Sequence, residues 1–271
     1  MLSTTTIPTL EDFLAAPLAD IAAVAPPTVA ISVNDARSNA ALDGITPRID
    51  EFAAWPQPSL PAYIDLLFTN GVRHVFAAAS ISPNMADQGL ASPEMLEDYA
   101  RRGWRVRVLG AEGIPELQPI AEAFVRATPP NWSRTLWWTM TPTPEAPWDA
   151  LFDTIARTGA RTPADAIRAL YGEVIPPAGM FLSFGKPLII YDLVPPLLVG
   201  NVQSYWLQRP GHRLDERMLR TIIYDYAYLR PTGQQIDEKY LDVTAHRAVW
   251  ETNAALGMGQ RRGSFWYPML N

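Results

Sequence analysis

Apolar residues along this chain gather in short strand-like runs that are separated by stretches with helical periodicity. The strand-like runs are rich in β-branched, aromatic and other apolar residues and lie at 28–33, 72–78, 104–109, 135–140, 180–184 and 203–207. Stretches with helical spacing lie at 9–18, 59–68, 94–102, 115–127, 148–157, 162–171, 214–229 and 237–256. The alternation predicts an α/β fold, with a mainly parallel central sheet of about six strands flanked by helices.

Capping residues and prolines mark the ends of these elements. Thr9 and Asp12 have capping-box spacing, and Asn70-Gly71 is expected to stop the helix before it. Most prolines cluster between the predicted elements, where loops are expected, and no stretch has the composition of a flexible linker. We therefore expect residues 1–271 to form a single domain.

Composition and charge exclude several classes of function. The net charge of −6 argues against nucleic acid as a partner. The chain has no cysteine for a disulfide or thiolate metal site, and its three histidines lack the spacing of a zinc site. No apolar stretch is long enough for a membrane span, and no basic segment precedes an apolar run near the N-terminus. We therefore expect a cytoplasmic protein without stable membrane insertion.

The most informative residue is Asp35, which follows the first predicted strand. After this acid the chain continues into the polar residues Arg37, Ser38 and Asn39. In parallel α/β folds the carboxyl ends of the strands form the edge where ligands bind, so a charged group there is a candidate functional residue. The alternative is that Asp35 only caps the next helix.

Common catalytic motifs are missing from the sequence. There is no G-x-S-x-G nucleophile elbow and no Walker A loop. The Gly-x-Gly at 257–259 has no strand–helix unit after it, which argues against a dinucleotide site there. No two Asp residues are adjacent, so the Asp-rich magnesium cluster of helical terpene cyclases is absent as well.

Longer segments of the sequence resemble a known enzyme family. They are Phe13-Leu14 with Pro17-Leu18, the strand ending in Asp35, Asp50-Glu51-Phe52, segments 169–173 and 180–186, Tyr205-Trp206, segment 219–230 and the tail from Gly257 to Trp266. In order and spacing, these segments resemble divergent cis-prenyltransferases, in particular the tuberculosinol-synthase-like bacterial diterpene synthases. The resemblance covers nearly the whole chain and implies the α/β fold of undecaprenyl diphosphate synthase.

The resemblance also implies a reaction and the residues that perform it. Family members ionise an allylic prenyl diphosphate with help from Mg²⁺, trap the carbocation in an apolar, aromatic-lined cavity, and usually form homodimers. Asp35 falls on the essential Asp of the family, which implies that it holds Mg²⁺ or orients the diphosphate. Phe52 falls where the diterpene-synthase branch has a functional Tyr, and Lys186 falls on a basic loop position suited to phosphate.

The sequence departs from the family pattern at the turn that binds diphosphate. The family carries Arg three to four residues after its Asp, where this chain has Ser38 and Asn39. The backbone amides of a turn or of a helix N-terminus still bind phosphate. The candidate diphosphate ligands are therefore Arg37, Ser38, Asn39 and Lys186.

Condensation with a second diphosphate is not expected. Gln203 stands near the position of the metal-binding Glu of chain-elongating members, and arginines for a second diphosphate are not evident at 183–187. We therefore expect a terpene synthase that ionises one C20 prenyl diphosphate and forms a terpene alcohol or hydrocarbon. One alternative is a prenyltransferase that moves the prenyl group to a small acceptor such as a nucleoside. Others are a non-catalytic isoprenoid-binding accessory subunit and an enzyme whose substrate lacks diphosphate.

Overall fold

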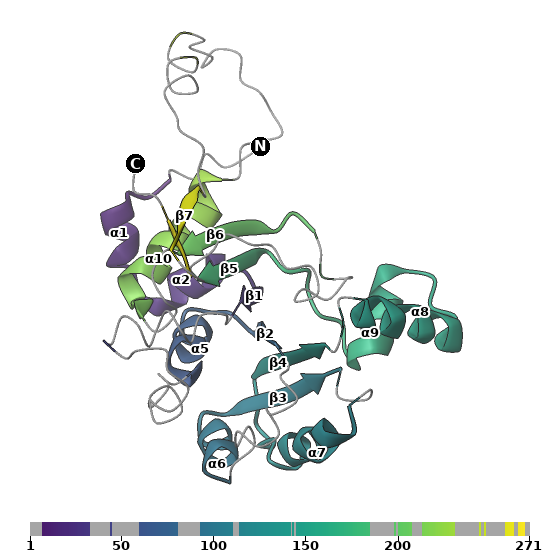
Figure 1. The fold of residues 1–271 in the computed structure, drawn as a ribbon. Coiled ribbons are helices and arrows are strands. Elements are labelled where there is room, and N and C mark those ends of the chain that lie inside the picture. Colours follow the sequence, from purple (N-terminus) through teal and green to yellow (C-terminus); the bar gives the residue numbers. More distant parts are fainter. Residues whose placement is uncertain are drawn as a thin grey trace, which may run out of the picture.

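The fold is built on one parallel sheet (Figure 1). The computed structural model describes residues 7–32, 44, 60–80, 93–110, 114–141, 143, 145–184, 198, 200–207, 213–230, 244, 247, 258–262 and 265–268. Within these residues six parallel strands follow the order β3-β4-β2-β1-β5-β6. They are β1 (Thr28–Ser32), β2 (His74–Ser80), β3 (Trp104–Leu109), β4 (Arg134–Thr141), β5 (Met180–Phe184) and β6 (Gln203–Leu207). The predicted fold class is thereby confirmed.

Helices join the strands and pack on the sheet. In chain order they are α1 (Leu10–Leu14), α2 (Leu18–Val24), α5 (Leu60–Thr69), α6 (Pro93–Arg101), α7 (Gln118–Arg126), α8 (Ala146–Thr158), α9 (Pro163–Tyr171) and α10 (Glu216–Tyr224). A 3-10 helix (Pro115–Leu117) precedes α7, and a π-helix (Asp225–Leu229) continues α10. Strands β7 (Gly259–Arg262) and β8 (Phe265–Pro268) form an antiparallel hairpin. No helix in the described part is long and apolar enough to cross a membrane.

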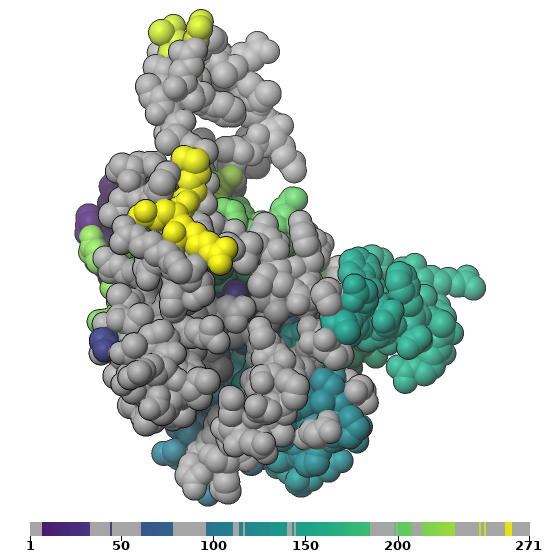
Figure 2. Space-filling view, in the orientation of Figure 1, coloured from purple at the N-terminus to yellow at the C-terminus, as the bar shows by residue number. Residues whose placement is uncertain are grey.

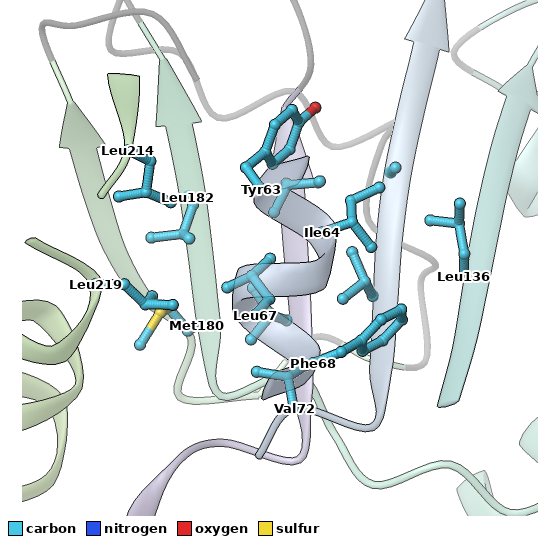
Figure 3. Packing of buried hydrophobic residues seen from close by; sticks show 14 of the residues in the cluster. Tyr63, Ile64, Leu67, Phe68, Val72, Leu136, Met180, Leu182, Leu214 and Leu219 are labelled. Atoms are coloured by element: carbon cyan, nitrogen blue, oxygen red, sulfur yellow. The ribbon is translucent and has the colours of Figure 1, made fainter. Parts of the chain in front are cut away.

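Alternating side chains divide the core between the two faces of the sheet. On one face, Val29 and Ile31 of β1 join a large buried cluster with α5, which lies over the central strands in Figure 3. On the other face, Ala30 joins a smaller cluster that includes Ile167 of α9. Every residue of β1 is buried, as expected for a central strand covered on both sides.

Two predicted helices are longer than the helices of the structure. The helix expected at 9–18 is interrupted between Leu14 and Leu18, because Pro17 has no N–H to continue α1 and instead stands at the N-cap of α2. The helix expected at 214–229 changes from α to π at Asp225. The helix expected at 237–256 lies outside the described residues, except for two isolated positions.

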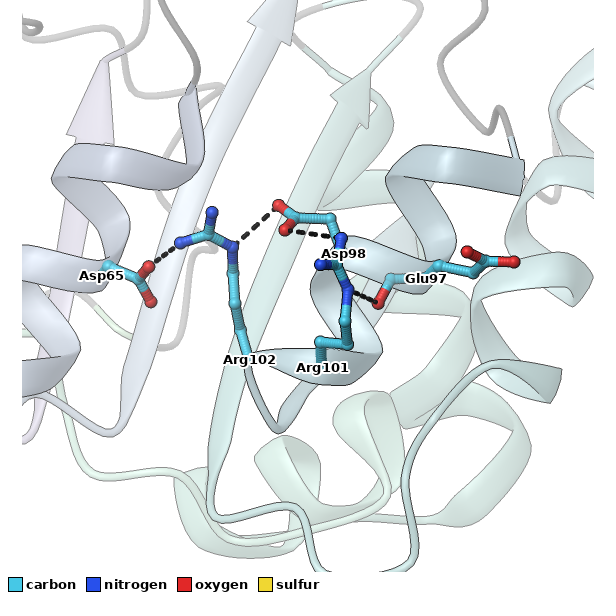
Figure 4. A network of polar contacts seen from close by, with 5 residues as sticks. All are labelled: Asp65, Glu97, Asp98, Arg101 and Arg102. Atoms are coloured by element: carbon cyan, nitrogen blue, oxygen red, sulfur yellow. Dashed lines mark hydrogen bonds and ion pairs between the residues drawn. The ribbon is translucent and has the colours of Figure 1, made fainter.

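An ion-pair network joins α5 to α6 (Figure 4). Arg102 pairs with Asp65 of α5, and its Nε lies 2.7 Å from Oδ2 of Asp98 in α6. Arg101 adds a contact of 3.4 Å between its Nη2 and Oδ1 of Asp98. Because the Arg102 and Asp65 side chains are 30% and 32% exposed, each pair contributes no more than about 1 kcal/mol.

The pair α8–α9 projects from the side of the sheet in Figures 1 and 2. Gly159 ends α8 with a left-handed φ of 67°, which favours glycine. The Thr162 hydroxyl then caps α9 by accepting a hydrogen bond from the backbone N–H of Asp165. A shallow open hollow beside this turn is lined by solvent-exposed groups, including Asp165 and Arg168.

Candidate active site at the carboxyl edge of the sheet

At β1 the chain switches from building one side of the sheet to building the other. Because the six strands are parallel, their carboxyl ends lie along one edge of the sheet. The chain adds β2 on one side of β1 and later adds β5 on the other side. In open α/β sheets, ligands bind in the crevice outside the carboxyl ends at such a switch point. The candidate active site is therefore the region beyond the ends of β1 and β5.

Small side chains occupy the strand ends at this switch point. Ser32, the last residue of β1, is in register with Ser183 of β5 and with Ala78 of β2. One strand further, Thr139 of β4 is in register with Ala78. The Oγ1 atom of Thr139 is buried without a hydrogen-bond partner among the described residues. On this face, Ser32, Ser183 and Thr139 are small polar residues near the carboxyl ends of their strands.

Tyr63 of α5 reaches the same edge from the opposite face. Its ring packs edge-to-face against Phe184, the last residue of β5, with ring centroids 5.8 Å apart. The side chain is 9% exposed, and in Figure 3 its hydroxyl points toward the carboxyl ends of the strands. Burial, with a smaller contribution from Tyr99, raises the pKa of Tyr63 far above its usual range, so the phenol stays neutral.

The six residues that the sequence proposes for the chemistry lie outside the described residues. Asp35, Arg37, Ser38, Asn39 and Phe52 fall on the connection between β1 and α5, and Lys186 follows β5. The strand order therefore attaches Asp35 and Lys186 to the two strands that flank the switch point. The roles of all six residues remain predictions.

A magnesium site at this edge would rest on few protein ligands. Among the residues that the structure describes, no three His, Asp or Glu side chains group as metal ligands. The strands at the switch point end in Ser32 and Phe184, so Asp35 is the candidate carboxylate. Proteins commonly hold Mg²⁺ by one or two carboxylates together with substrate phosphates and water, so this donor set fits the ion.

Aromatic side chains fill the space between the sheet and helices α6 and α7. Trp138 of β4 packs against Phe124 with ring centroids 6.0 Å apart, and Tyr99 stacks on Trp104 at 5.2 Å. The indole Nε1 atoms of Trp104 and Trp138 are buried without a hydrogen-bond partner in the described part of the chain. This region of the larger core cluster is therefore apolar and rich in π-electron faces.

A second polar cluster lies at the opposite, amino-terminal edge of the sheet. Arg105 of β3 donates from Nη2 to Oγ1 of Thr135 at 2.8 Å and pairs with Glu173. Trp137 donates from Nε1 to Nδ1 of His74 at 3.2 Å. Burial is the main cause that lowers the pKa of His74, which keeps the imidazole neutral and able to accept this bond. Since these groups satisfy one another, we interpret the cluster as structural.

Sequence reasoning missed a network at the start of the π-helix. Tyr205 of β6 donates to Oδ2 of Asp225 at 2.7 Å, and Arg230 donates to the same oxygen at 2.6 Å. Burial first, and the hydrogen bond to Asp225 second, raise the pKa of Tyr205. The sequence signal is an acid inside an otherwise apolar and aromatic run. The network fixes the π-helix to the edge strand β6.

Comparison with solved structures identifies the class of fold. Lavandulyl diphosphate synthase from Lavandula x intermedia, solved in complex with dimethylallyl diphosphate, matches with a TM-score of 0.57. The match covers 76% of this chain and 97% of that chain at 14% sequence identity, so it shows a common fold. The sheet is thus that of a cis-prenyltransferase-like protein.

Comparison with characterised sequences identifies the family. The chain is 40% identical over 277 residues to (+)-kolavelool synthase from Herpetosiphon aurantiacus, and the match covers 96% of each protein. It is also 29% identical over 111 residues to tuberculosinyl adenosine transferase from Mycobacterium tuberculosis, covering 39% of this chain and 37% of that protein. No family model matches the chain.

The match over almost the full length is decisive. The chain belongs to the family of (+)-kolavelool synthase, diterpene synthases with the cis-prenyltransferase fold. It is therefore an enzyme of the class that eliminates diphosphate. The resemblance stated from the sequence segments is confirmed.

Proposed function

We propose that the enzyme ionises one allylic C20 prenyl diphosphate, linear or already cyclised, and quenches the carbocation to a terpene alcohol or hydrocarbon. The observation that supports this most directly is the strand order. An acid, Asp35, follows β1 and a base, Lys186, follows β5, and these neighbouring strands flank the switch point. A ligand that carries both negative charge and metal affinity, such as a diphosphate, suits such a pair of residues.

The diphosphate end of the substrate is assigned to the segments that follow these strands. Lys186 and Arg37 would place positive charge near the diphosphate oxygens, and Ser38 and Asn39 would donate hydrogen bonds. Such groups stabilise the negative charge that develops on the leaving group as the allylic C–O bond breaks. Asp35 is assigned to hold Mg²⁺ or to orient the diphosphate. Bound Mg²⁺ supplies further stabilisation of the leaving charge.

The prenyl chain and the carbocation need an apolar cavity that excludes stray water. We assign Phe52 to the wall of this cavity, where its ring would stabilise positive charge by cation–π interaction. Tyr63 and Phe184 bring further aromatic rings to the same edge of the sheet. Support for water as the final nucleophile comes from the relative at 40% identity, because kolavelool is named as an alcohol.

The test is incubation of the purified enzyme with a panel of C10 to C20 prenyl diphosphates, with Mg²⁺ or with EDTA. The proposal predicts release of pyrophosphate and one dominant C20 product by mass spectrometry, with turnover lost in EDTA. Release of pyrophosphate that persists at full rate in EDTA would contradict the role of Mg²⁺ but not the elimination. Binding of the diphosphates without any product would support the accessory-subunit alternative.

A second candidate function is transfer of the prenyl group to a small acceptor. The partial match to tuberculosinyl adenosine transferase favours it, although that match covers only 39% of this chain. The discriminating experiment adds adenosine and other nucleosides to the reaction with isotope-labelled C20 diphosphate. Labelled adducts in place of the free alcohol or hydrocarbon would establish the transferase.

We propose that the enzyme forms a homodimer, as the family resemblance also suggests. Helix α8 carries an apolar stripe formed by Trp148, Phe152 and Ile155, which are 48%, 61% and 36% exposed. The rings of Trp148 and Phe152 lie 6.3 Å apart, so the stripe is continuous. A contiguous exposed apolar patch favours an interaction surface.

The charges along α8 fit a second copy of the same helix. The exposed acids Glu145, Asp149 and Asp153 lie before or within its first two turns, whereas the exposed arginines Arg157 and Arg161 lie near its C-terminus. When two copies pack antiparallel about a two-fold axis, the acids of one copy approach the arginines of the other.

Sedimentation velocity tests this interface. We expect the wild-type enzyme to sediment as a dimer and the double variant Trp148→Ser/Phe152→Ser to sediment as a monomer. Met218→Ser, which changes an exposed apolar residue of α10, serves as the matched control and should remain dimeric. A monomeric wild-type enzyme, or a dimeric double variant, would refute the proposed interface.

We assign the enzyme to the cytoplasm. The lack of cysteine is compatible with this assignment, since disulfides are typical of oxidising compartments. Recovery of the enzyme in the membrane or secreted fraction of its native cells would contradict it.

A further inference from the structure

Tyr63 is held rigidly at the edge of the sheet where the reaction is assigned. It lies in the first turns of α5, and the next buried residues of this helix, Ile64, Leu67 and Phe68, are 0%, 1% and 2% exposed. These side chains pack against the central strands, so α5 has little freedom to rotate. Contact with Phe184 then fixes the Tyr63 ring against the end of β5.

The hydroxyl of Tyr63 has no structural role in the described part of the chain. In Figure 3 the other labelled core side chains of α5 extend toward the body of the sheet, whereas the Tyr63 hydroxyl points toward the carboxyl edge. No hydrogen bond joins this hydroxyl to a described residue. A hydroxyl that points to a ligand-binding edge and has no hydrogen-bond partner among the described residues is therefore a candidate to bind a ligand or a water molecule.

The position of the Tyr63 hydroxyl favours water over the diphosphate as its ligand. The hydroxyl lies on the face of the sheet that carries the large apolar cluster, beside the end of β5 and near the aromatic ring of Phe184. A neutral phenol among apolar groups is poorly suited to replace a cation as a ligand of the diphosphate. It is well suited to hold one water molecule next to a hydrocarbon, since its oxygen accepts one hydrogen bond and its O–H donates another.

We propose that the Tyr63 hydroxyl binds the water molecule that quenches the allylic carbocation, and that Tyr63 thereby sets the ratio of alcohol to hydrocarbon product. The proposal deepens the proposed function and rests on it. Tyr63 acts as a positioning residue, because the bond to carbon is made by the water.

The reaction balances without a further reactant. The allylic C–O bond breaks, and its electron pair leaves with pyrophosphate. A lone pair of the bound water forms the new C–O bond, and the proton lost from the resulting oxonium ion passes to the pyrophosphate. The Tyr63 oxygen accepts one hydrogen of that water and so directs a lone pair toward the cation. Burial keeps the pKa of Tyr63 high, so no phenolate forms to trap the cation itself.

The variant Tyr63→Phe tests the proposal, because it removes the hydroxyl and keeps the ring. The readouts are the pyrophosphate released and the ratio of alcohol to hydrocarbon, with H₂¹⁸O to label alcohol formed from water. We expect the ratio to fall about tenfold, as for loss of one hydrogen bond in the step that traps the cation, while pyrophosphate release stays within a few-fold of wild type. Tyr99→Phe removes another buried hydroxyl from the same core cluster and should leave the ratio unchanged.

The possible failures of the two proposals are distinguishable. A wild-type enzyme that releases no pyrophosphate from any prenyl diphosphate overturns the proposed function and this inference together. A wild-type enzyme that releases pyrophosphate but forms only hydrocarbon overturns this inference alone. An unchanged ratio in Tyr63→Phe, or an equal fall in Tyr99→Phe, does the same. Tyr63→Leu also lacks the hydroxyl and provides the same comparison if Tyr63→Phe fails to fold.

Discussion

Gly71 determines how closely α2 approaches the turn between α5 and β2. Its φ is +104°, a left-handed value that L side chains rarely adopt. A Cβ atom at this position would lie 2.5 Å from Cα and 2.7 Å from Cβ of Ala22 in α2. Both distances are far below van der Waals contact. Because the nearest atom belongs to the backbone of a helix, a rotamer change in α2 does not relieve the clash.

The variant Gly71→Ala therefore combines two costs. Placing a side chain at a left-handed φ costs about 1 kcal/mol, and overpacking against a fixed backbone costs about 1–3 kcal/mol more. We expect a total loss of about 2–4 kcal/mol, which corresponds to a fall of roughly 5–15 °C in melting temperature for a chain of this size. Gly103→Ala is the matched control, since Gly103 has a φ of +72° but no atom within 4 Å of its added Cβ.

Urea unfolding followed by circular dichroism measures both variants. We expect Gly103→Ala to lose only about 1 kcal/mol, the cost of its backbone conformation. The m-values should equal that of the wild type, since neither change alters the surface exposed on unfolding. If the two variants lose the same stability, the close packing of α2 on this turn is wrong.

Two further predictions concern the amino-terminal edge of the sheet. Burial lowers the pKa of His74 below its usual value of 6.5, so the unfolded state binds more protons than the folded state once the pH falls to about 6.5. Stability should therefore fall as the pH falls through 6.5 and the hydrogen bond from Trp137 is lost. Urea midpoints measured between about pH 8 and pH 5 should show this loss of stability in the wild-type enzyme and a smaller loss in His74→Gln. Identical pH profiles for the two proteins would contradict the role of His74. Glu173→Gln should cost about 1–3 kcal/mol in urea unfolding, because the Arg105 side chain is only 10% exposed. Glu122→Gln, which breaks the exposed ion pair with Arg126, should cost less than about 0.5 kcal/mol. Equal losses of stability in Glu173→Gln and Glu122→Gln would show that burial of Arg105 is unimportant.

Local patterns predict the elements of this fold well, but they do not predict their order in the sheet. The runs at 104–109, 180–184 and 203–207 are strands with the predicted limits, since turn residues or prolines flank them. The insertion of β4 between β3 and β2 depends on pairing between strands that are distant in sequence. No local propensity encodes that pairing. The sequence does not predict the β7–β8 hairpin either, because both strands have only four residues and β7 is rich in charged and polar residues.

The sequence likewise predicts only part of the candidate site. The sequence alone placed Asp35 after a strand and so at the carboxyl edge of a sheet, but the strand order is needed to attach Lys186 to the neighbouring strand. The sequence does not single out Tyr63, because its position in the helical period predicts a core residue, and it is one. Its contact with Phe184, far away in the sequence, shows which end of the core its hydroxyl approaches.

The role of Asp35 in diphosphate elimination is tested by the rate of pyrophosphate release from a C20 prenyl diphosphate by the wild-type enzyme and by Asp35→Asn. We expect the substitution to lower the rate at least about 100-fold, as for loss of a group that stabilises the leaving charge. Asp20→Asn, a change of an exposed acid in α2, should leave the rate unchanged. A folded Asp35→Asn enzyme that releases pyrophosphate at the wild-type rate would show that Asp35 takes no part in diphosphate elimination.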